Sequence, residues 1–484
     1  MADVRRDNFG GNLLLCPASA HVPASEEEVL RILDAHRGER IRAVGALHSW
    51  SDAPATDGVL LDLRLLNHVS VEQDADGPVA VVGAGCRIKR LLRELDSQAR
   101  CTLPSLGLIT EQTIAGAIST GTHGSGRNSM SHYVAGVRVA RYDADTGTAL
   151  IEEISAGDDL RAARCSLGSL GVILTVRIRC RARYDVEERF REHRRLEDVL
   201  SAEASFPLQQ FFLIPWRWSY FAQHRREGTG SASRLAWLYR LYWLAVLDVG
   251  LHLLVLFFLR VVRSGRLIRM MFRRVVSLFV IRGWSVTGPS SSMLVMRHDL
   301  FRHIEIELFV RRSRIDDALR YAQEVLEVAA GTRSELSADN HRRVEELGMS
   351  EHLAELHGRY CHHYPICVRR VLPDDTLISM ASGAGEDWYA LSFISYAKPN
   401  DRAGFSLFAK FLGRSMSRLL EARPHWGKVC PLDAGELSRL YPRFADFRAA
   451  CDARDPSGVF RNRWTASLLD EGSRDAVSNS GEDA

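Results

Sequence analysis

The sequence lacks the short motifs that mark several common classes of enzyme. It has no Gly-x-Gly-x-x-Gly after an apolar run and no Gly-x-x-x-x-Gly-Lys-Ser/Thr, so neither a Rossmann nor a P-loop site is expected. It has no His-Glu-x-x-His and no paired-cysteine spacing, so no metal is expected. The nine cysteines include no Cys-x-x-Cys, which favours free buried thiols over a disulfide framework. The polar segment 1–11 has no apolar stretch, so no cleaved secretory signal is expected.

Neither positive nor negative charge is in large excess. The 63 Lys and Arg residues nearly balance the 60 Asp and Glu residues, for a formal net charge of +3, so no nucleic-acid partner is expected. Hydrophobic residues make up 46% of the chain and charged residues 25%, as in ordinary folded proteins. A chain of 484 residues is too long for a single core, and two domains are expected.

Hydrophobic periodicity predicts an α+β pattern of short strands and helices. Ser25-Glu-Glu-Glu28 predicts a capping box that opens a helix with Val29, Leu30 and Leu33 facing inward. The other predicted strands and helices follow from alternation and from 3.6-residue spacing. The strands are Ile41–Val44, Val59–Leu63, Val79–Val82, a half-buried Val172–Cys180, Ile304–Val310 and Tyr389–Tyr396; the helices are Arg87–Gln98, Ile315–Val328 and Phe405–Leu420. The last dozen residues are polar and predict a disordered tail.

A long apolar run is the sharpest change of composition. Leu241–Leu259 is long enough to span a bilayer, but Asp248 near its centre argues against a full span. Arginines follow at positions 260, 263, 266, 269, 273 and 274, and the apolar residues between them, from Leu267 to Phe272, predict a helix lying in a membrane interface. Two interpretations stay open: contact with a membrane surface, which the arginines favour, and a helical hairpin packed on the body of the protein.

Three local motifs carry polar chemistry. His48 ends an apolar run in a tight turn, within Ile41–Asp52. The segment Glu111–Gly126 is rich in glycines and hydroxyls, which let backbone N–H groups approach a phosphate, although a plain loop has the same composition. Near the C-terminus, His425-Trp-Gly-Lys428 places a cation close to an imidazole.

Five segments together resemble, in chain order, the motifs of the vanillyl-alcohol-oxidase-type (PCMH-type) FAD flavoproteins. They are Gly45–Ser49, Glu111–Gly126, Leu167–Ile173, Arg423–Lys428 and Asp455–Asn462. The resemblance is greatest to the aldonolactone oxidase branch, which includes L-gulonolactone oxidase and D-arabinono-1,4-lactone oxidase. It implies an α+β fold in which residues 1–185 form a two-part FAD-binding domain. Residues 186–484 then form an antiparallel-sheet-plus-helices cap domain and C-terminal region, with the apolar segment at 236–282 and residues 421–465 returning to the flavin site.

The resemblance also implies FAD joined covalently to His48, because that histidine aligns with the one bonded to the flavin 8α-methyl group. A hydrogen-bonded turn histidine is the alternative. The residues expected to bind the cofactor are His48, Gly45, Ser49, Gly107, Gly116, Ser119, Thr122, His123, Gly124, Gly168, Gly171, Ile173 and Lys428. Gly107 stands where dehydrogenases of the family tend to carry alanine, so it favours access of oxygen to the flavin. The family's Gly-Gly-Gly before the histidine is replaced here by Gly-Ala-Leu, ending in Leu47.

The catalytic residues implied by the resemblance are Lys428, Arg369, His425 and Thr113. A cation such as Lys428 stabilises negative charge on the reduced flavin or on the substrate oxygen. Arg369 belongs to a family pattern Glu-x-Arg in which Cys367 here replaces the glutamate. Because a thiol does not accept hydrogen bonds from hydroxyls as a carboxylate does, this replacement puts the usual substrate in question.

The expected function is FAD-dependent oxidation of a sugar-1,4-lactone by hydride transfer to flavin N5, with molecular oxygen as acceptor and hydrogen peroxide as product. The alternatives are an alditol or alcohol oxidase, a carrier-linked dehydrogenase, and a membrane-associated flavin-binding protein without lactone turnover. The expected partners are therefore a small sugar lactone or polyol, oxygen and a membrane surface. The expected location is membrane-associated or cytoplasmic.

Overall fold

The computed structural model describes residues 6–228, 233–296 and 300–469. A small parallel sheet near the N-terminus has the order β3-β5-β4, formed by Ser19–His21, Val59–Asp62 and Ile41–Val44. Helix α1 (Glu26–Ala35) crosses between β3 and β4 and buries Val29 and Leu33. As predicted, the Ser25 hydroxyl caps this helix by accepting from the Glu28 N–H. The Glu28 carboxylate accepts from the Ala24 N–H instead, so the predicted capping box is not reciprocal.

An antiparallel sheet completes the N-terminal part, in the order β10-β9-β11-β7-β6. Its strands are Ala149–Ile154, Val134–Tyr142, Val172–Arg179, Gly77–Gly83 and Val69–Asp74. The accompanying helices are α2 (Ile88–Ala99), α3 (Ile114–Ser119) and α4 (Gly157–Arg164). The prediction that β11 is half-buried was wrong, because its first five residues are all buried. The strand lies in the middle of the sheet, where both faces are covered.

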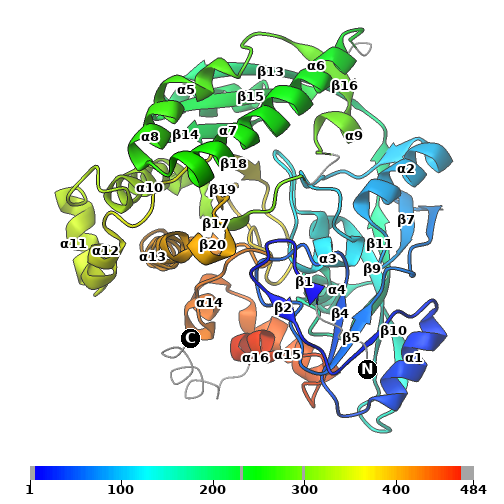
Figure 1. The fold of residues 1–484 in the computed structure, drawn as a ribbon. Coiled ribbons are helices and arrows are strands. Elements are labelled where there is room, and N and C mark those ends of the chain that lie inside the picture. The colour runs from blue at the N-terminus through cyan, green and yellow to red at the C-terminus, as the bar shows by residue number, and fades with distance from the viewer. Residues whose placement is uncertain (1–5, 229–232, 297–299, 470–484) are drawn as a thin grey trace.

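A larger antiparallel sheet lies above this part in Figure 1, and its eight strands have the order β16-β13-β15-β14-β18-β19-β17-β20. The strands are Val286–Pro289, Asp185–His193, Ser219–Glu227, Gln210–Ile214, Ile366–Val371, Trp388–Ser395, Ile304–Arg311 and Arg423–Pro424. On one face of β17, Ile306 and Leu308 pack in a core with α10 (Ile315–Ala329) and α13 (Ala403–Leu420). Because side chains alternate along a strand, Glu305 and Glu307 lie on the other face, the face that carries Phe309 into the core of the N-terminal part.

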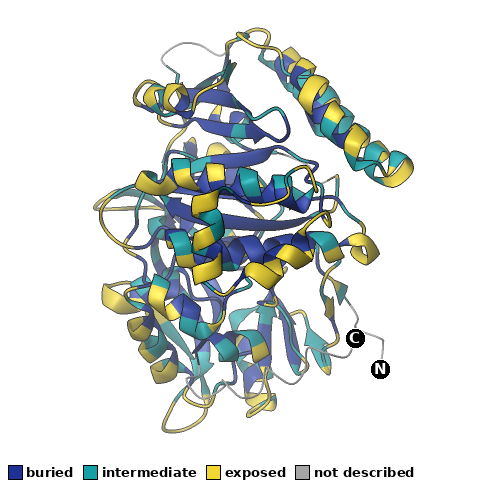
Figure 2. Cartoon of the chain, turned by 90° about the vertical axis from the view of Figure 1, so that its left-hand side faces the viewer, coloured by how far each residue is buried: buried dark blue, intermediate teal, exposed yellow. Residues whose placement is uncertain are grey.

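The apolar segment forms one continuous helix, Ala236–Val262, which includes α6 (Ala236–Tyr242) and α7 (Leu251–Phe257). It is long and apolar enough to cross a membrane, and 22% of its most apolar window is buried. One face packs on the large sheet, while the outer face in Figure 2 is exposed. The exposed residues include Trp237 at 66%, Leu241 at 51%, Leu253 at 54%, Phe257 at 50% and Val261 at 67%. The buried face fits a hairpin packed on the body of the protein, and contact of the exposed face with a membrane stays a prediction.

Helix α8 (Gly265–Arg274) follows as the second arm of a hairpin. The expectation that its apolar residues all lie in a membrane interface was wrong for Ile268, Met271 and Phe272, which are buried in the protein core. Leu267 and Met270 are exposed. The difference arises because an amphipathic helix presents the same pattern to a protein surface and to a lipid surface.

The C-terminal segment returns to the N-terminal part, through α14 (Ala434–Leu440), α15 (Phe444–Arg454) and α16 (Arg463–Leu469). The Ile41 N–H donates to the Val459 carbonyl at 2.9 Å, and the buried Arg42 guanidinium donates to the Phe460 carbonyl at 2.9 Å. The remaining elements include β1 (Arg6–Asp7), β2 (Leu14–Leu15), β8 (Cys101–Thr102), β12 (Arg181–Ala182), α5 (Leu196–Ser201), α9 (Ser290–Met293), α11 (Ala338–Glu346) and α12 (Ser350–Leu356). The predicted disordered tail lies outside the described residues beyond 469.

Candidate active site

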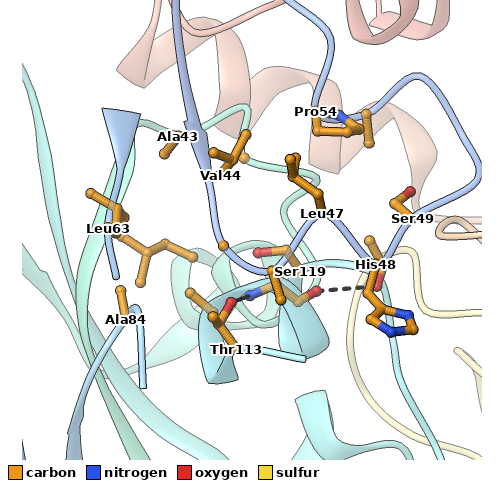
Figure 3. Close-up of a pocket in the computed structure, with 18 of the residues that line it drawn as sticks. Ala43, Val44, Leu47, His48, Ser49, Pro54, Leu63, Ala84, Thr113 and Ser119 are labelled. Carbon is orange, nitrogen blue, oxygen red and sulfur yellow. Dashed lines mark hydrogen bonds between the residues drawn. The ribbon is translucent and has the colours of Figure 1, made fainter. Parts of the chain in front are cut away.

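The first cavity, named the loop cavity, lies between the ends of the parallel strands and α3 and encloses about 890 Å³. Figure 3 shows His48 and Ser49 on one side of it and Leu63 and Ala84 on the other. Nine of the residues expected to bind cofactor or substrate line it: Gly45, His48, Ser49, Thr113, Gly116, Ser119, Gly168, Gly171 and Ile173. Small residues, hydroxyls and a glycine-rich backbone fit the phosphates and ribose of a dinucleotide.

Two backbone positions shape the loop that carries His48. A Cβ atom on Gly45 would lie 2.0 Å from the Thr113 hydroxyl oxygen, so only glycine fits there. Leu47 has a φ of 54°, in the left-handed region that glycine adopts readily and that costs other residues about 1–2 kcal/mol. The leucine that replaces the family's glycine thus keeps a glycine-like backbone.

Thr113 lies with the residues expected to hold the cofactor. It is the N-cap of α3, and its hydroxyl accepts from the Gly116 N–H at 3.4 Å. It lines the loop cavity and not the cavity that contains Lys428 and Arg369. Thr113, one of the residues expected to be catalytic, therefore lies with the residues expected to bind the cofactor.

The second cavity, named the inner cavity, is under the large sheet and encloses about 1130 Å³. His48 lines both cavities, so the two meet at this imidazole. The other expected residues around the inner cavity are Gly107, Thr122, His123, Arg369, His425 and Lys428. Gly124 lines a smaller cavity beside it. The structure thus brings the distant motifs of the sequence to one place.

Lys428 is fixed by an acid and an aromatic ring. Its ammonium group donates to Glu305 and lies 4.0 Å from the centroid of the Trp50 ring, a cation–π contact. Glu305 also accepts from the Ser392 hydroxyl, and His303 Nε2 lies 3.8 Å away. Burial alone would raise the pKa of Glu305, but Lys428 and His303 hold this pKa well below its usual value. The carboxylate is therefore ionised, and Lys428 stays at the cavity wall.

Glu307 forms a second charged group, two residues along the same strand. Its Oε1 lies 3.3 Å from His123 Nε2 and 3.8 Å from the Arg369 guanidinium. The residue is 2% exposed, and this oxygen makes no hydrogen bond among the described residues. Burial opposes ionisation, yet the neighbouring His123 lowers the pKa of Glu307. A buried, ionised oxygen without a donor is poised to receive one from a bound molecule.

His425 is held in one tautomer. Its Nδ1 accepts from the Gly427 N–H at 2.9 Å, so the proton of the neutral ring is on Nε2. Burial lowers its pKa to about 3, which keeps the ring neutral at ordinary pH. His123, Glu307 and His425 offer atoms within 4.8 Å of one another, a spacing that suits a metal ion. The protonated Nε2 favours hydrogen-bond donation by His425 over metal ligation.

The glutamates of β17 are candidate site residues that the sequence interpretation missed. The resemblance placed a carboxylate at position 367, where burial raises the pKa of the Cys367 thiol and keeps it protonated. Cys367 pairs in register with Ser392 on the neighbouring strand, and Ser392 bonds to Glu305. The available signal was the alternation Ile304-Glu-Ile-Glu-Leu308, which places two acids on one face of a strand. Trp50 was missed as well.

The backbone at Gly107 packs closely against the Thr122 side chain. A Cβ atom at Gly107 would lie 2.6 Å from the Thr122 methyl carbon. An alanine there would have to displace that methyl group, so the glycine allows the close packing of this part of the wall of the inner cavity.

Comparisons with known proteins agree with this geometry. Residues 17–148 match the model of the FAD binding domain, and residues 246–468 match the model of D-arabinono-1,4-lactone oxidase. A long-chain alcohol oxidase of an uncultured marine euryarchaeote is 69% identical over 96% of this chain and 97% of its own length. L-Gulono-1,4-lactone dehydrogenase of Mycobacterium tuberculosis is 28% identical over 96% of this chain and 98% of its own. Cholesterol oxidase from Brevibacterium sterolicum shares the fold, with a TM-score of 0.71, 14% identity and 96% of each chain covered.

The fold and the paired cavities define an FAD-dependent oxidoreductase. The chain belongs to the PCMH-type FAD flavoproteins, in the aldonolactone oxidase branch. The predicted family, α+β fold and FAD cofactor are thereby confirmed.

Proposed function

We propose that this protein oxidises a hydroxyl-bearing carbon to a carbonyl, and that its substrate is an alcohol. The observation that supports this proposal is the set of charged groups around the inner cavity. Lys428, Arg369 and a Glu307 oxygen without a hydrogen bond lie around one space beside His48. When bound, FAD supplies the acceptor of the hydride. Lys428 and Arg369 stabilise the negative charge that develops on the substrate oxygen. The pair of Glu307 and His123 receives the hydroxyl proton.

The long-chain alcohol oxidase relative supports an alcohol substrate. A sugar-1,4-lactone or polyol is the second candidate, supported by the lactone oxidase model that matches residues 246–468. Molecular oxygen is the proposed acceptor, with hydrogen peroxide as product, and the alcohol oxidase relative supports it.

A steady-state screen tests the proposal. Primary alcohols, alditols and aldonolactones are supplied to the holoenzyme, with peroxide detection in air and with artificial acceptors without air. Peroxide from an alcohol is expected. Turnover of lactones alone would select the second candidate, and turnover only with artificial acceptors would make the protein a dehydrogenase.

His48 is the proposed site of a covalent bond to FAD. Its ring stands where the two cavities meet and stacks on Phe9, with centroids 4.2 Å apart. Denatured wild-type protein should therefore keep its flavin and fluoresce in a gel, and His48→Ala should release flavin on denaturation. The exposed His68 provides the control, since His68→Ala should retain the bond. Free FAD from acid-precipitated wild-type protein would contradict the tether.

The outer face of the helix Ala236–Val262 is proposed to lie on a membrane surface without crossing it. Exposed apolar side chains and the following arginines fit the interface of an anionic bilayer, where each basic residue contributes about 1 kcal/mol. Replacing Leu241, Leu253 and Phe257 together by Glu should move the protein from the membrane to the soluble fraction while the flavin stays bound. Wild-type protein found wholly soluble at low salt would contradict membrane contact.

A further inference from the structure

A third cavity, named the apolar cavity, lies between the large sheet and the inner face of the helix Ala236–Val262. It offers about 970 Å³ of space that is partly open to solvent. Its wall is formed mainly by aliphatic and aromatic side chains of β14, β15 and the helix: Phe212, Ile214, Phe221, Trp243, Leu247 and Leu251. The mechanism described above uses none of these residues.

The apolar cavity lies against the inner cavity, and the two share part of their wall. Phe212, Met296 and Leu108 line both, and so do Asp248 and Tyr364. A molecule whose polar end lies beside Lys428 would reach the space between the sheet and the helix past these shared residues.

Most polar groups of the apolar cavity bond to the protein itself, and the Gln223 amide nitrogen is a buried donor without a partner among the described residues. The Gln210 amide donates to the Gln223 side-chain oxygen at 2.7 Å. The Arg225 guanidinium pairs with Glu188 at 2.6 Å, and Arg240 donates to the Val295 carbonyl at 3.2 Å. A polyol would meet few groups here to replace its hydrogen bonds with water, whereas a hydrocarbon chain needs none.

We infer that the apolar cavity binds the alkyl chain of a long-chain alcohol whose hydroxyl lies in the inner cavity. This inference rests on the proposed oxidation of a hydroxyl group and adds the site that selects chain length. Because burial of one methylene is worth about fourfold in binding, kcat/KM should rise with each added carbon until the cavity is filled.

The experiment measures kcat/KM for primary alcohols from butanol to hexadecanol on the holoenzyme. The wild-type value should rise by up to about fourfold per carbon. Leu251→Trp fills the cavity from the helix and should lower kcat/KM for dodecanol about tenfold or more, with butanol little changed. Leu253→Trp is the matched control, because Leu253 lies two residues along the same helix and is 54% exposed.

Val280→Phe narrows the same cavity from the following segment and serves if Leu251→Trp fails to retain flavin. A wild-type kcat/KM that does not change with chain length would overturn the inference, and so would folded cavity variants that keep the wild-type profile. In either case the oxidation of short alcohols or lactones would still support the proposed function. If no alcohol and no lactone reduced the flavin, the proposed function itself would be wrong.

Discussion

Lys428→Met should lower kcat about 10²–10³-fold on any true substrate. The ammonium group is held at the wall of the inner cavity by Glu305 and by the Trp50 ring, and it is already oriented before a substrate binds. A preorganised group of this kind stabilises developing negative charge by about 2.7–4 kcal/mol. Methionine has a similar length and no charge, so the variant removes the cation and leaves the buried Glu305 carboxylate without its charge partner.

The control for this variant is Lys410→Met. Lys410 is an exposed residue on α13, and the same chemical change there should leave turnover intact. Flavin content and melting temperature are measured for both variants. Full activity of a correctly folded Lys428→Met protein would show that the inner cavity is not the site of the reaction.

Arg369→Ala should lower kcat/KM by about two orders of magnitude and should also lower the melting temperature. The Arg369 guanidinium lies 3.8 Å from Glu307, which is 2% exposed, so its removal leaves a buried carboxylate without this cation. Loss of one partner of a buried charge pair typically costs about 3–5 kcal/mol. Both substrate binding and turnover are affected because the same cation faces the substrate oxygen.

Arg370→Ala is the matched control for this second variant. Arg370 is the next residue on β18 and faces away from the cavity, where it pairs with Asp387 at 3.1 Å. The Arg370→Ala variant should keep the wild-type kcat/KM. If Arg369→Ala retained wild-type kcat/KM, the arginine would have only a structural part in the site.

The candidate site residues that the sequence identifies most readily are those in contiguous motifs. Gly45, His48 and Lys428 each lie in a short segment whose spacing is set locally, and all three line the two connected cavities. Glu305 and Glu307 could not be recognised in this way. An alternating strand usually turns its acids to solvent, and only the position of β17 inside the large sheet turns them inward.

The apolar segment shows a second limit of sequence interpretation. The pattern from Leu241 to Phe272 predicts helices with an apolar face, but it does not specify what covers that face. In the structure Leu251 and Phe272 are buried in the protein core, whereas Leu253 and Phe257 are exposed. The order of the eight-stranded sheet was likewise beyond prediction, because strands such as β14 and β18 pair across more than a hundred residues.

The most direct test of the account is anaerobic reduction of the bound flavin by 1-dodecanol, followed by stopped-flow absorbance at the flavin band. We expect complete bleaching, slower with the alcohol deuterated at its first carbon because the hydride leaves that carbon, and slowed about 10²–10³-fold in Lys428→Met. If the wild-type protein kept the spectrum of oxidised flavin with dodecanol, with shorter alcohols and with aldonolactones, the proposed oxidation of a hydroxyl group would be wrong.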